Sequence, residues 1–223
     1  MCNRYIAPTA VELERSFRVR SGEVPAWKQH VFPRALAPFI RRGRDDASYT
    51  RELVVGQWGL LPWFAKTAKL PYSTNNARSE EVSAKPTYRD PWKRGQRCII
   101  PAISFDEPNW ESGKNVWWSF RRADGELWGL AGLWSTWRDK GTGEEHESFT
   151  MLTINADAHP LMSRMHKPDP KLPPDRQDKR SVIPLEAEDW DQWLAGTSHE
   201  ATSLLRCASM EVFDASPAME YST

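Results

Sequence analysis

The chain has 223 residues, and its 30 basic and 30 acidic side chains give a formal net charge of zero. This balance excludes a chain-wide attraction to nucleic acid or to an anionic membrane, although a local basic patch remains possible. The cysteines, Cys2, Cys98 and Cys207, are odd in number and lack C-x-x-C spacing, which argues against a disulfide scaffold and a zinc site. No apolar run approaches the ~18 residues that cross a bilayer, and no secretory signal opens the chain. We therefore expect a soluble, cytoplasmic protein with one domain over residues 1–223.

Apolar patterning predicts more strands than helices. Helical spacing is found at residues 9–19, 77–85 (ended by Pro86), 159–165 and 186–194. Apolar runs bounded by turn residues predict strands at 34–42, 51–62, 97–107, 115–122, 127–138, 147–156, 180–185 and 208–216. Charged turns are expected at 43–48 and at 123–126, where Asp-Gly favours a hairpin. The sequence predicts an α+β fold, a curved antiparallel sheet or barrel with peripheral helices.

The opening residues, MCNRY, place a cysteine directly after the initiator methionine. Removal of Met1 would leave Cys2 with an α-amine and a thiol on adjacent carbons. These groups titrate near ~8 and ~8.5, so both are partly nucleophilic at neutral pH. Taken alone, Cys2 is more often an incidental residue on a frayed terminus.

Three internal segments hold the other polar candidates. In YSTNNARSEE, the Asn76 amide can orient a reacting group, whereas the alternative is a turn at Asn75 and Asn76 with a Ser79 cap. Asp106 and Glu107 follow an apolar run, where partial burial would raise a carboxyl pKa, or they simply mark a strand leaving the core. His166 can shuttle protons or merely end a short helix.

The order of these segments along the chain resembles one protein family. MCNRY is similar to M-C-G-R-[FY], WGLLPWF to W-G-[LY]-x-P-x-W, and NNARSE to N-A-R-x-E. WKRGQRCIIPA with the later FDE resembles W-x-x-G-R-R-C-[LI]-I-P-A-x-x-[FW]-[YF]-E, and FTMLTINADAHPLMSRMHK resembles the segment before the family histidine. Five motifs in register over nearly the whole chain indicate the SOS-response-associated peptidase (SRAP) family, whose members shield abasic sites in DNA.

The resemblance implies roles for four residues. Cys2 matches the family's catalytic N-terminal cysteine, Asn76 the asparagine beside it, Glu107 the catalytic glutamate and His166 the catalytic histidine. In such proteins the cysteine amine forms a Schiff base with the ring-opened abasic-site aldehyde, and the thiol closes a stable thiazolidine. Ring closure is intramolecular and therefore favoured. By resemblance, Glu107 moves protons at the amine, His166 protonates the sugar oxygen, and Asn76 holds the terminus. Removal of Met1, by the protein itself or by an aminopeptidase, would create the reactive terminus.

The implied ligand is single-stranded DNA that contains an abasic site. Arg4 and Arg78 match family arginines near the site and are expected to bind phosphates. Trp58 and Trp63 fall in the tryptophan segment expected beside the DNA, although core packing is an alternative, more so for Trp58. The resemblance implies an enzyme with peptidase or lyase-like character. We expect no cofactor, no metal, no membrane association and a monomer.

Several segments depart from the family pattern. Asn3 replaces a usual glycine, KQHVFP at 28–33 replaces a polar segment, and HKPDPKLPP, in residues 166–174, lacks the arginine expected just after the histidine. The rim that would face DNA is therefore expected to differ from that of relatives.

Two other functions are compatible with the same sequence. The first is an N-terminal-cysteine peptidase or amidohydrolase acting on a peptide or amide. The second is a non-catalytic module that binds single-stranded DNA. The presence of all four core residues favours chemistry over the non-catalytic module.

Overall fold

The structure is a computed structural model that describes residues 1–19, 22, 24–43 and 50–218. The turn predicted at 43–48 lies almost wholly outside the described residues. The strands are β1 (Tyr5–Ile6), β2 (His30–Val31), β3 (Leu36–Arg42), β4 (Arg51–Trp58), β5 (Asn76–Arg78), β6 (Arg97–Ala102), β7 (Ser104–Asn109), β8 (Val116–Arg122), β9 (Trp128–Arg138), β10 (Glu145–Asn155), β11 (Arg180–Val182) and β12 (Phe213–Pro217). The α-helices are α1 (Ala10–Phe17), α2 (Pro86–Lys93), α3 (Trp190–Ala195) and α4 (Ser198–Ser203), and the 3-10 turns are η1 (Ser79–Glu81), η2 (Met162–Arg164), η3 (Ala187–Asp189) and η4 (Met210–Val212).

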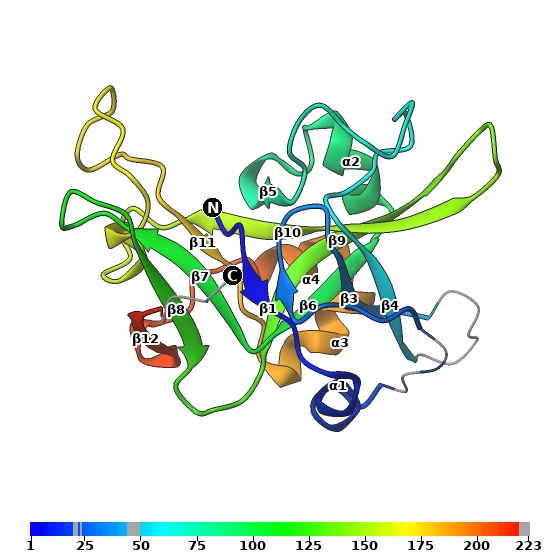
Figure 1. Cartoon of the computed structure of the whole chain (residues 1–223), viewed down its shortest axis with the longest axis horizontal. Helices are drawn as coiled ribbons and strands as arrows, with labels where there is room; N and C mark the ends of the chain where they lie inside the picture. Colours follow the sequence, from blue (N-terminus) through cyan, green and yellow to red (C-terminus); the bar gives the residue numbers. More distant parts are fainter. Residues whose placement is uncertain (20–21, 23, 44–49, 219–223) are drawn as a thin grey trace.

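Five strands close into a barrel in the order β3, β4, β10, β9, β6 and back to β3. Only the β4–β10 contact in this ring is parallel. At that contact a Cβ on Gly56 would lie 2.6 Å from the backbone oxygen of Glu147, so only glycine lets the two strands approach this closely. A second sheet has the order β12, β8, β7, β1, β2. The predicted strand-rich α+β fold with a barrel and peripheral helices is confirmed (Figure 1).

Alternate residues of the barrel strands enter two different cores. On β3, Phe39 packs against Phe149 with ring centroids 5.3 Å apart, while the next residue, Ile40, joins the cluster under the helices. This alternation follows from the two-residue period of a strand. Both faces of the barrel wall are therefore buried, which explains why its strands read as nearly continuous apolar runs.

Helices cover the outer face of the barrel. α1 begins at a capping box in which the Glu12 carboxylate accepts from the Thr9 backbone N–H at 2.7 Å. Its last residue, Phe17, stacks on Trp190 of α3 with centroids 4.5 Å apart. α3 packs on β3 and β6, and α2 packs on β9. The helix predicted at 9–19 is confirmed.

Two predicted boundaries and one predicted hairpin are wrong. β8 and β9, which flank the Asp-Gly turn at 123–126, belong to different sheets and do not pair. Pro86 begins α2 rather than ending a helix, because proline fits the first helical turn, where its missing N–H is not needed. The preceding residues form β5 and the short turn η1 instead. The run 97–107 is two strands, β6 in the barrel and β7 in the second sheet. Between them the Ile103 N–H donates to the Ile6 oxygen at 2.7 Å, which turns the chain from one sheet to the other.

This turn brings the N-terminus to the barrel. β1 pairs antiparallel with β7, and Tyr5 lies edge-on to Trp58 of β4 at 5.0 Å. The N-terminus leads directly into β1 of the second sheet, as Figure 1 shows. Within the described ranges, no helix has the length and apolarity that crossing a membrane requires.

Candidate active site

Four segments meet at the N-terminus: residues 1–4, β5, the end of β7 and the loop after η2. β5 lies parallel to β10, with Asn76 in register with Met151. The loop after η2 reaches β7 through a bridge between Asn109 and Met165. The structure thus brings together Cys2, Asn76, Glu107 and His166 from positions far apart in the sequence.

Cys2 is fully buried. Its thiol donates to the Arg4 oxygen at 3.4 Å. Burial raises the pKa of the Cys2 thiol well above its usual value, and the nearby Glu107 carboxylate raises it further. The residue is therefore a neutral thiol at physiological pH. The frayed terminus that one cysteine alone would indicate is wrong.

Two neighbouring asparagines hold the backbone of Cys2. The Asn76 side chain donates to the Cys2 oxygen at 2.6 Å. The Asn75 side chain donates to the same oxygen at 3.4 Å and to Asn3 Oδ1 at 3.1 Å. Asn3, which departs from the family glycine, thus has a partner. The contact of Asn75 with the terminus could not be predicted from the sequence, because an Asn-Asn pair is equally typical of a turn.

Glu107 and His166 flank the terminal amine. Glu107 Oε2 lies 2.8 Å from His166 Nε2 and 3.7 Å from the Met1 nitrogen, and this nitrogen also contacts His166 Nε2. The Glu107 side chain is 1% exposed. Burial acts to raise the pKa of Glu107, but the Met1 amine and then His166 outweigh it, and the net pKa is lowered. The expectation that burial would raise this pKa is wrong for Glu107, which is ionised at neutral pH.

The pKa of the neighbouring Asp106 is raised, as expected, by burial that the Arg4 charge only partly offsets. Asp106 points away from the terminal amine and pairs with Arg4, whose Nε lies 2.6 Å from Asp106 Oδ2. The two adjacent carboxyls have opposite pKa shifts because burial prevails at Asp106, whereas the Met1 amine and His166 outweigh it at Glu107.

His166 has an unusual backbone conformation. Its φ is 64°, in the left-handed region that costs a non-glycine residue about 1–3 kcal/mol. Its N–H donates to the Pro108 oxygen at 2.6 Å. Strain of this kind persists where surrounding contacts fix the chain, and it is concentrated at functional sites.

In Asn76, Glu107 and His166, three buried atoms have neither a hydrogen-bond partner nor an ion-pair contact among the described residues. They are Asn76 Oδ1, Glu107 Oε1 and His166 Nδ1. Most buried polar atoms in native proteins are paired, so a group of unpaired ones beside a reactive terminus indicates where a substrate can bind.

The arginines predicted to bind DNA both already have acidic partners. The guanidinium of Arg4, besides pairing with Asp106, lies 4.3 Å from the Trp117 ring centroid. Arg78, with its side chain 42% exposed, pairs with Asp178 and lies 3.6 Å from a Glu81 oxygen. Neither residue therefore presents an isolated cation to a ligand.

The two tryptophans predicted to face DNA differ in exposure. Trp58 is fully buried and its indole N–H donates to the Asn75 oxygen at 2.8 Å. Its predicted DNA contact is therefore wrong, because a buried ring in the barrel offers no stacking face. Trp63 is 66% exposed and meets Phe64 edge-on at 5.7 Å.

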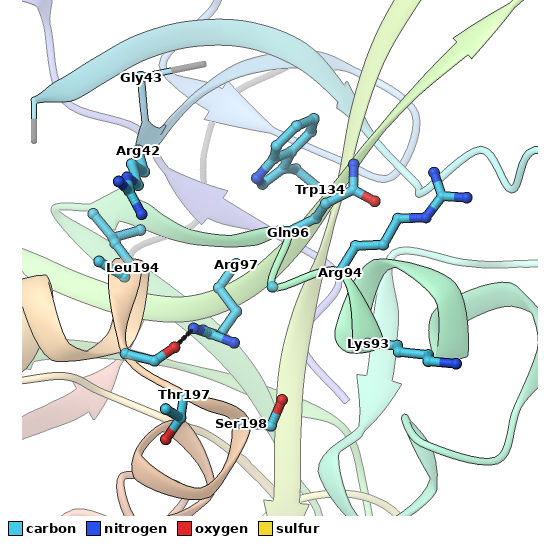
Figure 2. A pocket seen from close by; sticks show the side chains of 13 residues that line it. Arg42, Gly43, Lys93, Arg94, Gln96, Arg97, Trp134, Leu194, Thr197 and Ser198 are labelled. Carbon is cyan, nitrogen blue, oxygen red and sulfur yellow. Dashed lines mark hydrogen bonds between the residues drawn. The ribbon is translucent and has the colours of Figure 1, made fainter. Parts of the chain in front are cut away.

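A cavity of about 500 Å³ lies away from these residues, between the end of β3, the end of α2 and the α3–α4 connection (Figure 2). Three of its basic side chains lie at the C-terminal ends of helices. The buried Arg97 donates to the Trp193 and Gly196 oxygens at the end of α3, and Lys93 and Arg94 lie at the C-terminal end of α2. Cations at helix C-termini stabilise the helix dipole. Among the described residues, no group of three or more His, Cys, Asp or Glu side chains is arranged to hold a metal.

Comparison with curated proteins finds relatives of one kind. The abasic site processing protein YoqW of Bacillus subtilis is 33% identical over 129 residues, which are 57% of this chain and 56% of that protein. The abasic site processing protein HMCES of Xenopus tropicalis is 28% identical over 213 residues, 77% of this chain and 62% of that protein. The chain thus matches little more than half the length of these relatives.

Solved structures share the fold. A protein from Bordetella bronchiseptica superposes with a TM-score of 0.84 at 34% identity, over 98% of this chain and all of that one. A protein from Bacteroides thetaiotaomicron, at 24% identity, has a TM-score of 0.79 over 98% of this chain and 92% of its own. The family model described as SOS response associated peptidase (SRAP) matches residues 1–220. The chain belongs to the SRAP family.

Proposed function

We propose that this protein, once Met1 is removed, captures abasic sites in single-stranded DNA as a thiazolidine crosslink to Cys2. One observation carries the proposal: Cys2 is buried in a polar site next to the terminal amine. Asn76 holds the Cys2 carbonyl, and Glu107 and His166 lie against the terminal amine. The names of the relatives, abasic site processing proteins, support the same substrate.

The reaction uses both groups of an N-terminal cysteine. The Cys2 amine adds to the ring-opened aldehyde to give a carbinolamine, which loses water to form an imine. The thiol sulfur then adds to the imine carbon, and the thiol proton goes to the nitrogen. One aldehyde and one aminothiol thus give a five-membered thiazolidine and one water, with no oxidant or reductant. Fixing both groups on one residue makes the closing step intramolecular.

The electrostatics of the site fit these steps. In protein that retains Met1, the Met1 amine and His166 lower the pKa of Glu107, which is therefore ionised. After Met1 is removed, this carboxylate accepts the proton that the Cys2 amine releases as it adds to the aldehyde. His166 donates a proton to the sugar oxygen as the ring opens. The raised pKa of the Cys2 thiol keeps it protonated until the imine has formed. This order places amine attack before thiol attack.

Met1 occupies the position that the reactive amine needs. Its nitrogen contacts His166 and lies 3.7 Å from Glu107 Oε2. Hydrolysis of the Met1–Cys2 peptide bond would free the Cys2 amine beside the same pair. We therefore expect active protein to lack Met1, which intact mass spectrometry measures. Full activity from a form that retains Met1 would contradict the mechanism.

A cysteine peptidase acting on other peptides is the competing function, and the site favours it less. Peptidase nucleophiles are thiolates with lowered pKa in accessible, electropositive surroundings. Cys2 has the opposite properties, a buried thiol with a raised pKa beside a carboxylate. Peptide cleavage at this site is better matched to the chain's own Met1–Cys2 bond.

The deciding experiment mixes purified protein with a single-stranded oligonucleotide that carries one abasic site. We expect a protein–DNA band that survives boiling in SDS, and none with an intact oligonucleotide. Cys2→Ala is the matched control. A wild-type protein that binds the oligonucleotide without forming the band would instead support the non-catalytic module.

A further inference from the structure

A buried lysine donates hydrogen bonds to the backbone at His166. Lys179 Nζ donates to the Met165 oxygen at 2.7 Å and to the His166 oxygen at 2.6 Å. Lys179 is 7% exposed. Between His166 and Lys179 the chain makes an excursion over residues 167–178, so this lysine also joins the two ends of that loop (Figure 1).

The backbone of Lys179 is fixed by hydrogen bonds to Asp157 and Ala156. Its N–H donates to Asp157 Oδ1 at 2.8 Å, and the Asp178 N–H donates to the other oxygen of the same carboxylate at 3.1 Å. Its own carbonyl accepts from the Ala156 N–H at 2.7 Å, next to the β10–β11 pairing. Burial lowers the pKa of Lys179, with the Asp157 charge acting in the opposite direction. Burying an ammonium group costs desolvation free energy, and the hydrogen bonds to the Met165 and His166 oxygens offset that cost here.

These hydrogen bonds matter because the backbone of His166 is in the left-handed region. A residue at φ 64° relaxes toward the right-handed region unless neighbours hold it. Its N–H is fixed on the Pro108 oxygen of β7, and its C=O is fixed by Lys179. With both polar backbone groups tied, the ring is directed so that Nε2 lies 2.8 Å from Glu107 Oε2.

We infer that Lys179 is a positioning residue that holds His166 in its left-handed conformation and so sets the imidazole against Glu107. The inference rests on the proposed function, in which His166 supplies a proton during ring opening. Lys179 does not touch the substrate in this scheme. It acts through the backbone oxygens of Met165 and His166.

The test replaces the ammonium by an apolar group of similar length, Lys179→Met. Lys171→Met is the matched control, since Lys171 lies exposed in the same loop. General acid–base assistance is typically worth ~10²–10⁴-fold. We expect Lys179→Met to lower the single-turnover crosslinking rate at saturating abasic-site DNA by roughly tenfold or more. The DNA concentration for half-maximal rate should stay close to the wild-type value, and Lys171→Met should match wild type in both.

A second measurement separates positioning from a general loss of structure. If Lys179 acts through His166, the double variant His166→Ala/Lys179→Met reacts no more slowly than His166→Ala alone. The ring 1H–13C signals of His166, assigned by their absence in His166→Ala, should shift in Lys179→Met and not in Lys171→Met, while the signals of the other histidines stay in place.

The outcomes test the positioning role of Lys179 and the proposed function separately. Unchanged His166 ring signals in Lys179→Met, or a double variant slower than His166→Ala by the full Lys179→Met factor, would overturn the positioning role. A wild-type protein that forms no crosslink would remove the proposed function, and the His166 ring signals would still decide whether Lys179 sets the imidazole.

Discussion

The proposed reaction centre and the rim proposed to face DNA are built in opposite ways. At the centre, the Cys2 thiol and the Glu107 carboxylate are buried, and unpaired polar atoms remain for a substrate. At the rim, Arg78 is exposed and its charge is already balanced by acidic side chains of the chain itself. On the proposed function, the centre is organised before substrate arrives, whereas Arg78 would exchange its internal ion pairs for a phosphate.

This contrast predicts where substitutions act. Changes at the centre should alter the rate of chemistry at saturating DNA by large factors. Changes at the rim should alter affinity by small, salt-dependent factors, because exposed ion pairs contribute only about 0–1 kcal/mol.

The largest effect is expected from Cys2→Ala, which removes the thiol that closes the thiazolidine. No boiling-resistant crosslink should form, although an imine can still be trapped by borohydride reduction. Cys98→Ala and Cys207→Ala should retain crosslinking, because Cys98 is a buried residue of β6 and the Cys207 thiol contacts the Asn155 oxygen. Loss of crosslinking in all three folded variants would reveal a thiol function other than the one proposed.

The next effect separates Glu107 from His166. Glu107→Gln should slow crosslinking both to a native abasic site and to a substrate whose aldehyde is already open, by ~10²–10⁴-fold. His166→Ala should slow only the native site, because ring opening is bypassed in the open substrate. Single-turnover rates on both substrates measure this difference. Equal slowing of both by His166→Ala would make the ring-opening role wrong and favour phosphate positioning.

The sequence predicted the residues of the centre better than their surroundings. Motif order named Cys2, Asn76, Glu107 and His166, which the structure brings together, while their catalytic roles stay predictions. The contacts that support them cannot be read from spacing: Asn75 reaches Cys2 from 73 residues away, and Asp178 reaches Arg78 across 100 residues.

The fold, too, was predicted in part. Apolar runs predicted most barrel strands, since burial on both faces leaves a continuous signal. The shift from β6 to β7 at Ile103 was missed, because apolar residues continue through it. Trp58 was assigned to the rim by its motif, but only the barrel shows that its indole supports Asn75 from inside.

A smaller effect at the centre is a pH dependence of stability in protein that retains Met1. Because the folded-state pKa of Glu107 is lowered, its ionised form stabilises the fold at pH values above the unfolded pKa, near ~4.3. That contribution disappears as pH falls through the lower folded pKa. The difference in Tm between wild type and Glu107→Gln should therefore be largest near neutral pH and shrink below about pH 4. A difference that grows in acid would mean that Glu107 is protonated in the folded protein.

The smallest effect is expected at the rim, from Arg78 and its partner Asp178. Arg4 is a poorer test, because removing it would leave the buried Asp106 without its cation. If Arg78 binds a phosphate, Arg78→Ala should flatten the slope of log affinity against log salt by roughly one contact, or about 0.7 for a single strand. Asp178→Asn should instead strengthen DNA binding, because the phosphate no longer competes with the Asp178 carboxylate for Arg78. The gain in affinity should be at most about fivefold, in line with ~1 kcal/mol for an exposed pair.

Both rim variants are measured by binding to intact single-stranded DNA, which keeps the covalent step out of the comparison. Asp175→Asn is the matched control, an exposed acid of the same loop. If Asp178 holds Arg78 away from phosphate, Asp178→Asn strengthens binding most at low salt, and its gain vanishes when combined with Arg78→Ala. An equal gain from Asp175→Asn would show a general loss of negative charge. An unchanged salt slope in Arg78→Ala would place the strand elsewhere and leave the Arg78–Asp178 pair as part of the fold alone.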